Sequence, residues 1–317
     1  MLSRVAESVY WMNRYIERAE NAARVIDVSF QLMLDGGEEL AQWSPLVATS
    51  GSEALFKQQY GDAFSRENVI QFLAFDEKNP NSILSCFSYA RENARSVREI
   101  VSSEMWEQIN KAYLMVHDVS ENASRHEAPH EFFAAIKLAA HTFVGTTYLT
   151  MTHNEAWHFG RLGRLLERAD NTSRLVDAKY YFLLPTVADV GTTYDELHWV
   201  ALLRSASAFE MYRKRHGRIV PDLVVDFLLR EPQFPRSVRY AVIKAARSLG
   251  AIVRDGMEDT EAVRLLGKLR ADLEFDSTPE IIGKGLHEYA DQLQIKLIRI
   301  GQSIQDTFFT IRAEDAS

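Results

Sequence analysis

A set of arginine, glutamate and asparagine residues occurs twice in this chain, 150 residues apart. The segment Arg14–Asp27 recurs as Arg164–Asp177, and seven of its fourteen positions are identical in the two copies. Six of the seven identical residues are polar or charged, whereas the apolar positions vary among Tyr, Ile, Leu and Val. A repeat that served packing alone would keep its apolar volumes and vary its charges. The pattern therefore predicts a paired polar site.

The chemistry best suited to these residues is the binding of an anionic group. A guanidinium is planar and donates two parallel hydrogen bonds to a carboxylate or a phosphate. Glu17 and Glu167 each have arginines three residues before, one after and seven after. Positive charge this close lowers the pKa of a carboxyl group, which makes it a poor general base near neutral pH. We therefore expect the glutamates to orient the arginines and the arginines to bind the anion of a substrate or partner. The expected residues are Arg14, Glu17, Arg18, Asn21 and Arg24 in the first copy and Arg164, Glu167, Arg168, Asn171 and Arg174 in the second.

The same residues have a simpler interpretation as surface ion pairs. Glu20 and Arg24, like Asp170 and Arg174, lie four residues apart, in the order that stabilises a helix by about 0.2–0.5 kcal/mol per pair. Charged helical faces of this kind are usually solvated. The asparagines favour a site instead, because Asn is a poor helix former that a plain surface does not need. Both interpretations stay open on the sequence.

A third charged cluster comprises Arg91, Arg95 and Arg98. Their spacing of four and three residues predicts that they share one face of a helix. Three arginines on one stripe repel one another unless carboxylates or an anionic ligand neutralise them. The nearby Glu92, Glu99 and Glu104 offer the first solution, and an anion-binding role for the arginines is the alternative.

Other reactive side chains give weaker signals. Glu155-x-x-His158 has the spacing of one part of a di-iron site, but the corresponding position of the first copy lacks it. Glu127-x-x-His130 contains a proline. We therefore expect no metal site. The chain contains no Gly-rich phosphate loop, which predicts no ATP site of its own.

Three further features are expected to be structural. Cys86 lies in a mostly apolar stretch and is expected in the core, as are Trp11, Trp106, Trp157 and Trp199. The segment Phe234–Ser237 is typical of a helix start. Arg236 and Arg239 are secondary candidates for ligand contacts.

Helical geometry divides each copy of the repeat into two faces. In the first copy Met12, Ile16, Ala19, Ala23 and Ile26 fall on one stripe, and the charged residues fall on the opposite side. The second copy has the same division. Each copy is therefore expected to pack through its apolar face and to present its charged face.

Helical periodicity extends over almost the whole chain, and alternating strand patterns between hairpin turns are absent. Long helices are expected over residues 3–34, 81–100, 103–117, 131–151, 153–184 and 286–311, with shorter ones within 39–78. The sequence predicts an all-α fold, a bundle of long antiparallel helices. The repeat period exceeds the periods of solenoid proteins. It indicates one all-helical domain, 1–317, built from two related halves, about 1–150 and 151–317.

Composition narrows the class of protein. A net charge of −8 argues against a general nucleic-acid binder, and no apolar stretch approaches the length of a membrane span. A single cysteine suits a reducing compartment. No apolar signal segment opens the sequence. We therefore expect a cytoplasmic protein without nucleic-acid or membrane partners, and a homo-oligomer is compatible with the sequence.

The chain resembles the bacterial alpha-E domain family. The resemblance covers nearly the whole chain, and the two Glu-Arg-Ala-x-Asn signatures make it specific. Asn13 departs from the usual glycine, which the second copy has as Gly163, and His158 replaces a commonly basic residue. The segments that carry the resemblance are Ala6–Asn21, Ala90–Asn110, Glu155–Asp177, Trp199–Arg213 and Phe234–Arg239.

The resemblance implies the company of other proteins. Members are encoded beside, or fused to, circularly permuted ATP-grasp ligases and transglutaminase-like proteases, in clusters proposed to make or attach peptides. It implies that ATP and Mg are bound by the partner ligase, whereas no cofactor is expected in this chain. Three hypotheses remain. The chain is an accessory subunit that helps hold the substrate of the ligase, an enzyme that uses the paired Glu/Arg/Asn site, or a scaffold with internal salt bridges.

Overall fold

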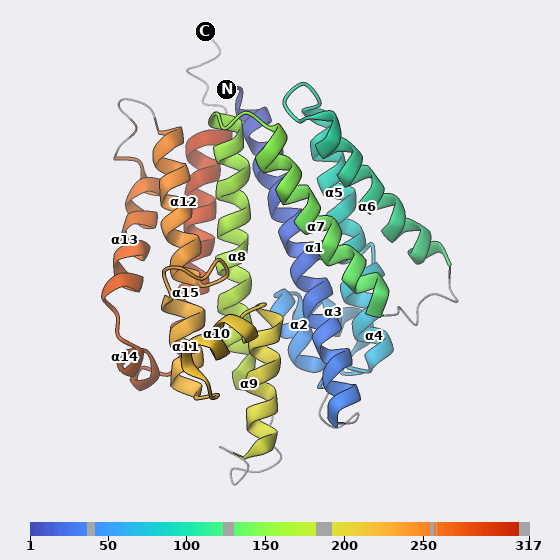
Figure 1. Cartoon of the computed structure of the whole chain (residues 1–317). Coiled ribbons are helices and arrows are strands. Elements are labelled where there is room, and N and C mark those ends of the chain that lie inside the picture. Colours follow the sequence, from blue (N-terminus) through green and yellow to red (C-terminus); the bar gives the residue numbers. More distant parts are fainter. Residues whose placement is uncertain (37–41, 123–129, 182–191, 254–256, 258, 311–317) are drawn as a thin grey trace.

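The computed structural model describes residues 1–36, 42–122, 130–181, 192–253, 257 and 259–310. Within these ranges the chain forms α-helices and two short π-helical segments, and no residue lies in a strand. The expected all-α fold is therefore confirmed. The long helices run side by side as an upright bundle (Figure 1).

The long helices form two groups of four with the same internal packing. In the first group α1 packs against α5 and α7, and α6 packs against the same two helices. In the second group α8 packs against α12 and α15, and α13 packs against those two. Contacts between α1 and α8 join the groups along the middle of the bundle (Figure 1). The first group comprises α1 (Ser3–Gly36), α5 (Ile83–Ser96), α6 (Ser103–Glu121) and α7 (His130–Thr150), and the second comprises α8 (Glu155–Tyr181), α12 (Val238–Ile252), α13 (Glu261–Phe275) and α15 (Leu286–Ile304).

Short helices occupy corresponding places in the two groups. In the sequence of each group, three short helices follow the first long helix and precede the second. They lie towards the lower end of the bundle in Figure 1. The first set is α2 (Ser44–Ser50), α3 (Glu53–Tyr60) and α4 (Arg66–Ile70), followed by the π-helical segment η1 (Gln71–Phe75). The second set is α9 (Thr193–Ser205), α10 (Phe209–His216) and α11 (Pro221–Arg230). The remaining elements are α14 (Thr278–Gly283) and the π-helical segment η4 (Gln305–Phe309).

The charged face of helix α1 is largely buried, like its apolar face. Its expected apolar stripe lies in the core, with Met12 and Ile26 fully buried. Glu17, Glu20 and Arg24 are also buried, with 4%, 1% and 8% of their surface exposed. The interpretation of this face as a solvated ladder is therefore wrong. The reason is that α5, α7 and α8 pack around α1 and cover most of its middle part.

Helices α1 and α8 are in close contact where α8 carries two glycines. A Cβ atom on Gly163 would lie 2.5 Å from the backbone oxygen of Tyr10, and one on Gly160 would lie 2.6 Å from Nδ2 of Asn13. Asn13 therefore fits in place of the glycine of the second copy because Gly160 leaves room for it. Its Nδ2 donates to the backbone oxygen of Val9 at 3.0 Å.

Most expected helix boundaries hold within a few residues, and one error affects a predicted site. Helix α5 begins after the cap residue Ser82, whose side chain accepts from the backbone N–H of Ser85, but it ends at Ser96 and not at residue 100. Arg98 therefore lies in the following turn, and the expected shared helical face of Arg91, Arg95 and Arg98 is wrong. Helix α6 extends beyond residue 117 to Glu121. Helix α1 extends two residues beyond its expected end, to Gly36. The expected helix end near residue 184, and Glu127 of the weak metal motif, lie outside the described residues.

Candidate functional site

The two Glu-Arg pairs of the repeat bind each other across the α1–α8 contact. Arg18 donates from Nε and Nη2 to the two carboxylate oxygens of Glu167, at 2.6 and 3.0 Å. Arg168 donates in the same way to Glu17, at 2.6 and 2.8 Å. Each interaction is a bidentate charge-assisted pair. The charged faces of the two repeats therefore converge, and they do so with pseudo-twofold symmetry.

The second arginine at each glutamate breaks this symmetry. Arg14 donates from Nε to Glu167 at 2.7 Å. Its counterpart Arg164 has a buried Nε without a hydrogen-bond partner. Arg236, from the turn before α12, takes its place and lies 3.6 Å from Glu17. Glu17 is thus held by one arginine of the repeat and one from outside it.

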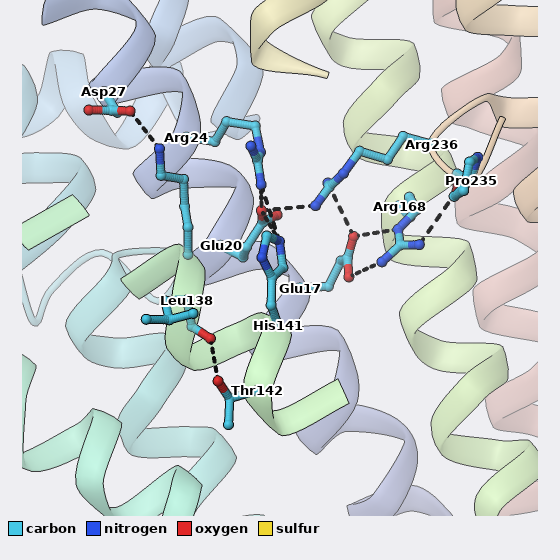
Figure 2. A network of polar contacts seen from close by, with 11 residues as sticks. Glu17, Glu20, Arg24, Asp27, Leu138, His141, Thr142, Arg168, Pro235 and Arg236 are labelled. Atoms are coloured by element: carbon cyan, nitrogen blue, oxygen red, sulfur yellow. Dashed lines mark hydrogen bonds and ion pairs between the residues drawn. The ribbon is translucent and has the colours of Figure 1, made fainter. Parts of the chain in front are cut away.

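The next turn of each repeat helix carries a second acid–arginine pair. Glu20 contacts Arg24 and accepts from Nη2 of Arg236 at 2.8 Å, and His141 of α7 lies 3.4 Å from Arg24 (Figure 2). In the second copy Arg174 donates to Asp170 at 2.9 Å. All the repeated arginines and acids are therefore within one buried polar layer between the two halves.

A third level of contacts, which the charged residues of the repeat did not predict, closes the layer. Asp27 contacts His130 and accepts from Lys137 of α7 at 2.5 Å. Asp177 pairs with His287 at 2.5 Å and accepts from Gln294 of α15 at 3.1 Å. The available signal was the His-Glu dipeptide that occurs at 130 and at 287, followed seven residues after each histidine by Lys137 or Gln294.

The arginines set the ionisation of the two central glutamates. Burial favours the neutral carboxyl group, but Arg168 and Arg236 outweigh it and lower the pKa of Glu17 to about 2. Arg18 and Arg14 lower the pKa of Glu167 to about 2 in the same way, against the effect of burial. Both carboxylates are therefore charged at neutral pH and are very weak bases.

The arginines on the α7 side of the layer are under-neutralised. Burial and the neighbouring Arg236 lower the pKa of Arg24 to about 9. Burial and Arg168 lower the pKa of Arg164 to about 10. On this side four arginines face only two glutamates. The arginines are Arg24, Arg164, Arg168 and Arg236, and the glutamates are Glu17 and Glu20. An additional anion would be favoured here.

A cavity of about 150 Å³ opens beside the layer on the other side, between α1, α8 and α2. Both repeats contribute to its wall, the first through Arg18 and Asn21 and the second through Asp170, Asn171 and Arg174. Nδ2 of Asn171 and Oδ1 of Asp170 are buried and have no hydrogen-bond partner. Buried polar atoms normally have partners. Two residues of the cavity wall therefore each have a polar atom that lacks a partner.

The loops around the cavity hold its arginines in place. Arg18 donates from Nη1 to Asn81, which precedes the cap of α5, and Asn81 in turn donates to Ser52 at 2.9 Å. Gly51, with φ of 67°, lies against the guanidinium of Arg174, and a Cβ atom there would be 2.6 Å from Nη1. Each half has a Pro-x-Ser tripeptide whose serine caps a helix, Ser82 at α5 and Ser237 at α12. The middle residue is Asn81 in the first half and Arg236 in the second, so one half supplies an amide and the other an arginine. The shared Pro-x-Ser pattern was the signal for these two residues.

The third arginine cluster lies outside the layer. Arg91 donates to Asn110 at 2.8 Å and lies 4.7 Å from the ring of Tyr113. Arg98 lies 4.9 Å from the ring of Trp106. Arg95 is exposed and lies 3.6 Å from Glu92. The structure thus brings ten of the thirteen predicted site residues together and leaves Arg91, Arg95 and Arg98 on the outer surface of α5 and the turn after it.

The cysteine and the tryptophans belong to the core or to its edges. Cys86 is fully buried, and burial raises the pKa of its thiol to about 12. Trp199 is buried, whereas Trp11, Trp106 and Trp157 are half-buried at the edges of the core. No group of three metal-ligating side chains occurs among the described residues. Within the same residues, every helix is too short or too polar to serve as a transmembrane segment.

Comparisons with known proteins agree with the architecture. Residues 1–309 match the model of Alpha-E, described as a predicted alpha-helical domain with a conserved ER motif. Uncharacterized proteins of Mycobacterium bovis and Mycobacterium tuberculosis are 26% identical over an alignment of 258 residues, and the alignment covers 75% of this chain. The match covers 28% of the length of these relatives. No solved structure matches the chain.

Proposed function

Because this chain belongs to the Alpha-E family, we propose that its two Glu-Arg motifs build a binding site and not a catalytic centre. The site would hold a carboxylate-bearing group, of an amino acid or a peptide, in the cavity between α1, α8 and α2. The chain would act as an accessory subunit of a circularly permuted ATP-grasp ligase that makes or attaches peptides, with a transglutaminase-like protein as a further partner. ATP and Mg would be bound by the ligase.

One observation carries the proposal. The cavity is lined by the equivalent residues Asn21 and Asn171 of the two repeats, and two residues of its wall, Asp170 and Asn171, each have a buried polar atom without a partner. Leaving a buried donor or acceptor unpaired costs about 1–3 kcal/mol, so a bound group that pairs with both is favoured.

The chemistry of the wall selects the ligand. Arg18 and Arg174 line the cavity, and a guanidinium group suits a carboxylate. Oδ1 of Asp170 can accept a hydrogen bond from an ammonium or amide N–H group. A carboxylate with a nearby N–H group is what an amino acid or the end of a peptide provides. ATP-grasp ligases activate carboxylates, which makes such a ligand suitable for the proposed partner.

Two alternatives receive different support. Catalysis by Glu17 or Glu167 is disfavoured because a carboxylate with a pKa of about 2 is a poor general base. The scaffold hypothesis is favoured by the reciprocal pairs between Arg18 and Glu167 and between Arg168 and Glu17, which join the halves. A structural role of these pairs is compatible with a ligand in the adjacent cavity. The two roles therefore need a variant that separates them.

Arg174 provides that variant, because its ion pair with Asp170 lies within one helix and does not join the halves. Arg174→Gln should leave the melting temperature almost unchanged and weaken the binding of N-acetylglycine about tenfold or more in calorimetric titration. N-acetylglycinamide, which lacks the carboxylate, should bind neither protein. Arg66→Gln, on the exposed helix α4, is the charge-matched control.

Coexpression tests the partner. The wild-type chain and the Arg66→Gln variant should copurify with the ATP-grasp protein from the same genome, and Arg174→Gln should reduce the yield of the ligase product. If the wild-type chain binds no carboxylate and the ligase product forms equally well without it, the proposed function is wrong.

A further inference from the structure

A second hollow, distinct from the cavity described above, lies on the opposite side of the α1–α8 contact. It has a volume of about 400 Å³ and runs between α7 and α8. Tyr148 and Leu149 of α7 form one wall, and Trp157, Arg161 and Arg164 of α8 form the other. This groove shares no residue with the cavity that contains Asn171.

Two arginines face the groove without a carboxylate. Arg161 donates from Nη1 to the hydroxyl of Ser248 at 3.2 Å and lies 5.3 Å from the ring of Trp157. Nε of Arg164 is buried and has no hydrogen-bond partner. The nearest acid of the repeat, Glu17, is already held by Arg168 and Arg236.

Burial and neighbouring arginines destabilise the charged forms of Arg161 and Arg164. Burial lowers the pKa of Arg161, and the neighbouring Arg247 lowers it further. Burial, Arg168 and Arg161 lower the pKa of Arg164 to about 10. A buried cation without a counter-ion is costly, and an anion that binds next to it removes this cost.

The rest of the groove is apolar and accessible. Tyr148 and Leu149 are 63% and 82% exposed and form a neighbouring apolar pair at the edge of the groove. Trp157 is half-buried and stacks on His153, with ring centroids 4.1 Å apart. An inorganic anion would use the arginines and leave these side chains in water. A larger organic anion would use both parts of the groove.

We propose that the groove between α7 and α8 binds a carboxylate attached to an aromatic or aliphatic body. The carboxylate would pair with Arg161 and Arg164, and the body would lie against Trp157, Tyr148 and Leu149. The C-terminal residue of a peptide with an apolar side chain has this chemistry. The proposal does not depend on the function of the other cavity, because the two sites have no side chain in common.

Titration of the full chain with N-acetylphenylalanine tests the site. We expect saturable binding, seen by calorimetry and as a change in tryptophan fluorescence at Trp157. N-acetylphenylalaninamide should bind at least tenfold more weakly, because it lacks the charge that the arginines pair with. Acetate and inorganic phosphate should also bind at least tenfold more weakly, because they lack the apolar body.

Matched variants assign the binding to this groove. Arg161→Gln should weaken N-acetylphenylalanine binding about tenfold, and Trp157→Leu should weaken it while preserving the preference for the acid over the amide. Arg174→Gln, in the other cavity, and Arg66→Gln, on the exposed surface, should leave the affinity unchanged. Circular dichroism shows whether each variant is folded. If Arg161→Gln does not fold, Trp157→Leu still tests whether the ligand binds in this groove.

Three results would overturn the proposal. Equal affinity for the acid and the amide would exclude recognition of the carboxylate. Phosphate binding as tight as that of N-acetylphenylalanine would indicate a simple anion site. Loss of binding in Arg174→Gln, with Arg161→Gln unaffected, would place the ligand in the cavity between α1, α8 and α2, which supports the proposed function and contradicts this inference.

Discussion

At the scale of the residue, the Glu-Arg dipeptide combines a buried carboxylate with a guanidinium group that binds the glutamate of the other half. Glu17-Arg18 and Glu167-Arg168 are the only Glu-Arg dipeptides in the sequence. Taking four charges out of water is expensive, and bidentate geometry with further donors to each carboxylate offsets that cost. Arg14 supplies the further donor at Glu167 and Arg236 lies close to Glu17. Removing one member leaves the others buried and uncompensated.

Glu167→Gln should therefore destabilise the protein strongly. The variant leaves Arg14 and Arg18 without their counter-charge in a place where Glu167 itself is only 1% exposed. Breaking a buried pair on one side typically costs about 3–5 kcal/mol. The free energy of unfolding from urea denaturation measures the loss. Glu92→Gln, at an exposed pair with Arg95, should change it by less than about 0.5 kcal/mol. Similar stability of both variants would show that the buried pair makes no net contribution.

The same carboxylates predict how stability changes with pH. Their folded pKa of about 2 lies below the ordinary value of 4.5, so the unfolded chain binds more protons as the pH falls. Their contribution to stability is complete above pH 4.5 and is lost as the pH falls towards 2. The difference in unfolding free energy between the wild type and Glu167→Gln should therefore shrink as the pH is lowered from 5 to 2. A difference that stays constant over this range would contradict the assignment.

At the scale of the element, the distance between α1 and α8 decides whether the arginines reach across. The guanidinium groups of Arg18 and Arg168 meet the opposite glutamates because α8 has no side chains at Gly160 and Gly163. Small residues let two helices pack closely. Here Gly163 lies one helical turn before Glu167, so the close packing fixes the distance that the arginine side chains must span.

Gly163→Ala should force the two helices apart. The new methyl group would lie 2.5 Å from a backbone oxygen, which no side-chain rotation relieves. We expect a loss of about 1–3 kcal/mol in the free energy of unfolding. Gly267→Ala, at an exposed position in the middle of α13 with nothing within 4 Å, should instead stabilise the protein by about 0.5–1 kcal/mol. Stabilisation by both substitutions would show that α1 and α8 can move apart without cost.

At the scale of the whole molecule, the two groups of four helices repeat one another beyond the segment first recognised. Asp27 with His130 and Lys137, and Asp177 with His287 and Gln294, tie α7 and α15 to the central helices in the same way. The polar layer therefore crosses the bundle from one outer helix to the other. The two halves share their buried charges and neither can satisfy them alone.

Unfolding should accordingly occur in a single transition. Circular dichroism, which follows all helices, and tryptophan fluorescence, which follows mainly the first half and α8, should give coincident curves in urea. Glu167→Gln should shift both curves together. Two separate transitions, or curves that do not coincide, would show that the halves fold as independent units.

The sequence by itself determined the helical class, because periodicity and caps are local, and it determined the paired polar residues, because a repeat is visible without coordinates. It did not determine where those residues lie. A helical pattern with one charged face ordinarily places that face in water, and only the packing of α5, α7 and α8 around α1 shows that this face is buried. The repeat itself did not show that Asn81 and Arg236 belong to the layer, since they come from loops far from the repeat in the chain. The same limitation applied to Arg98, whose predicted face depended on a helix that ends at Ser96. Local interactions fix which residues are helical, whereas burial and ion pairing depend on distances between segments that only the tertiary structure sets.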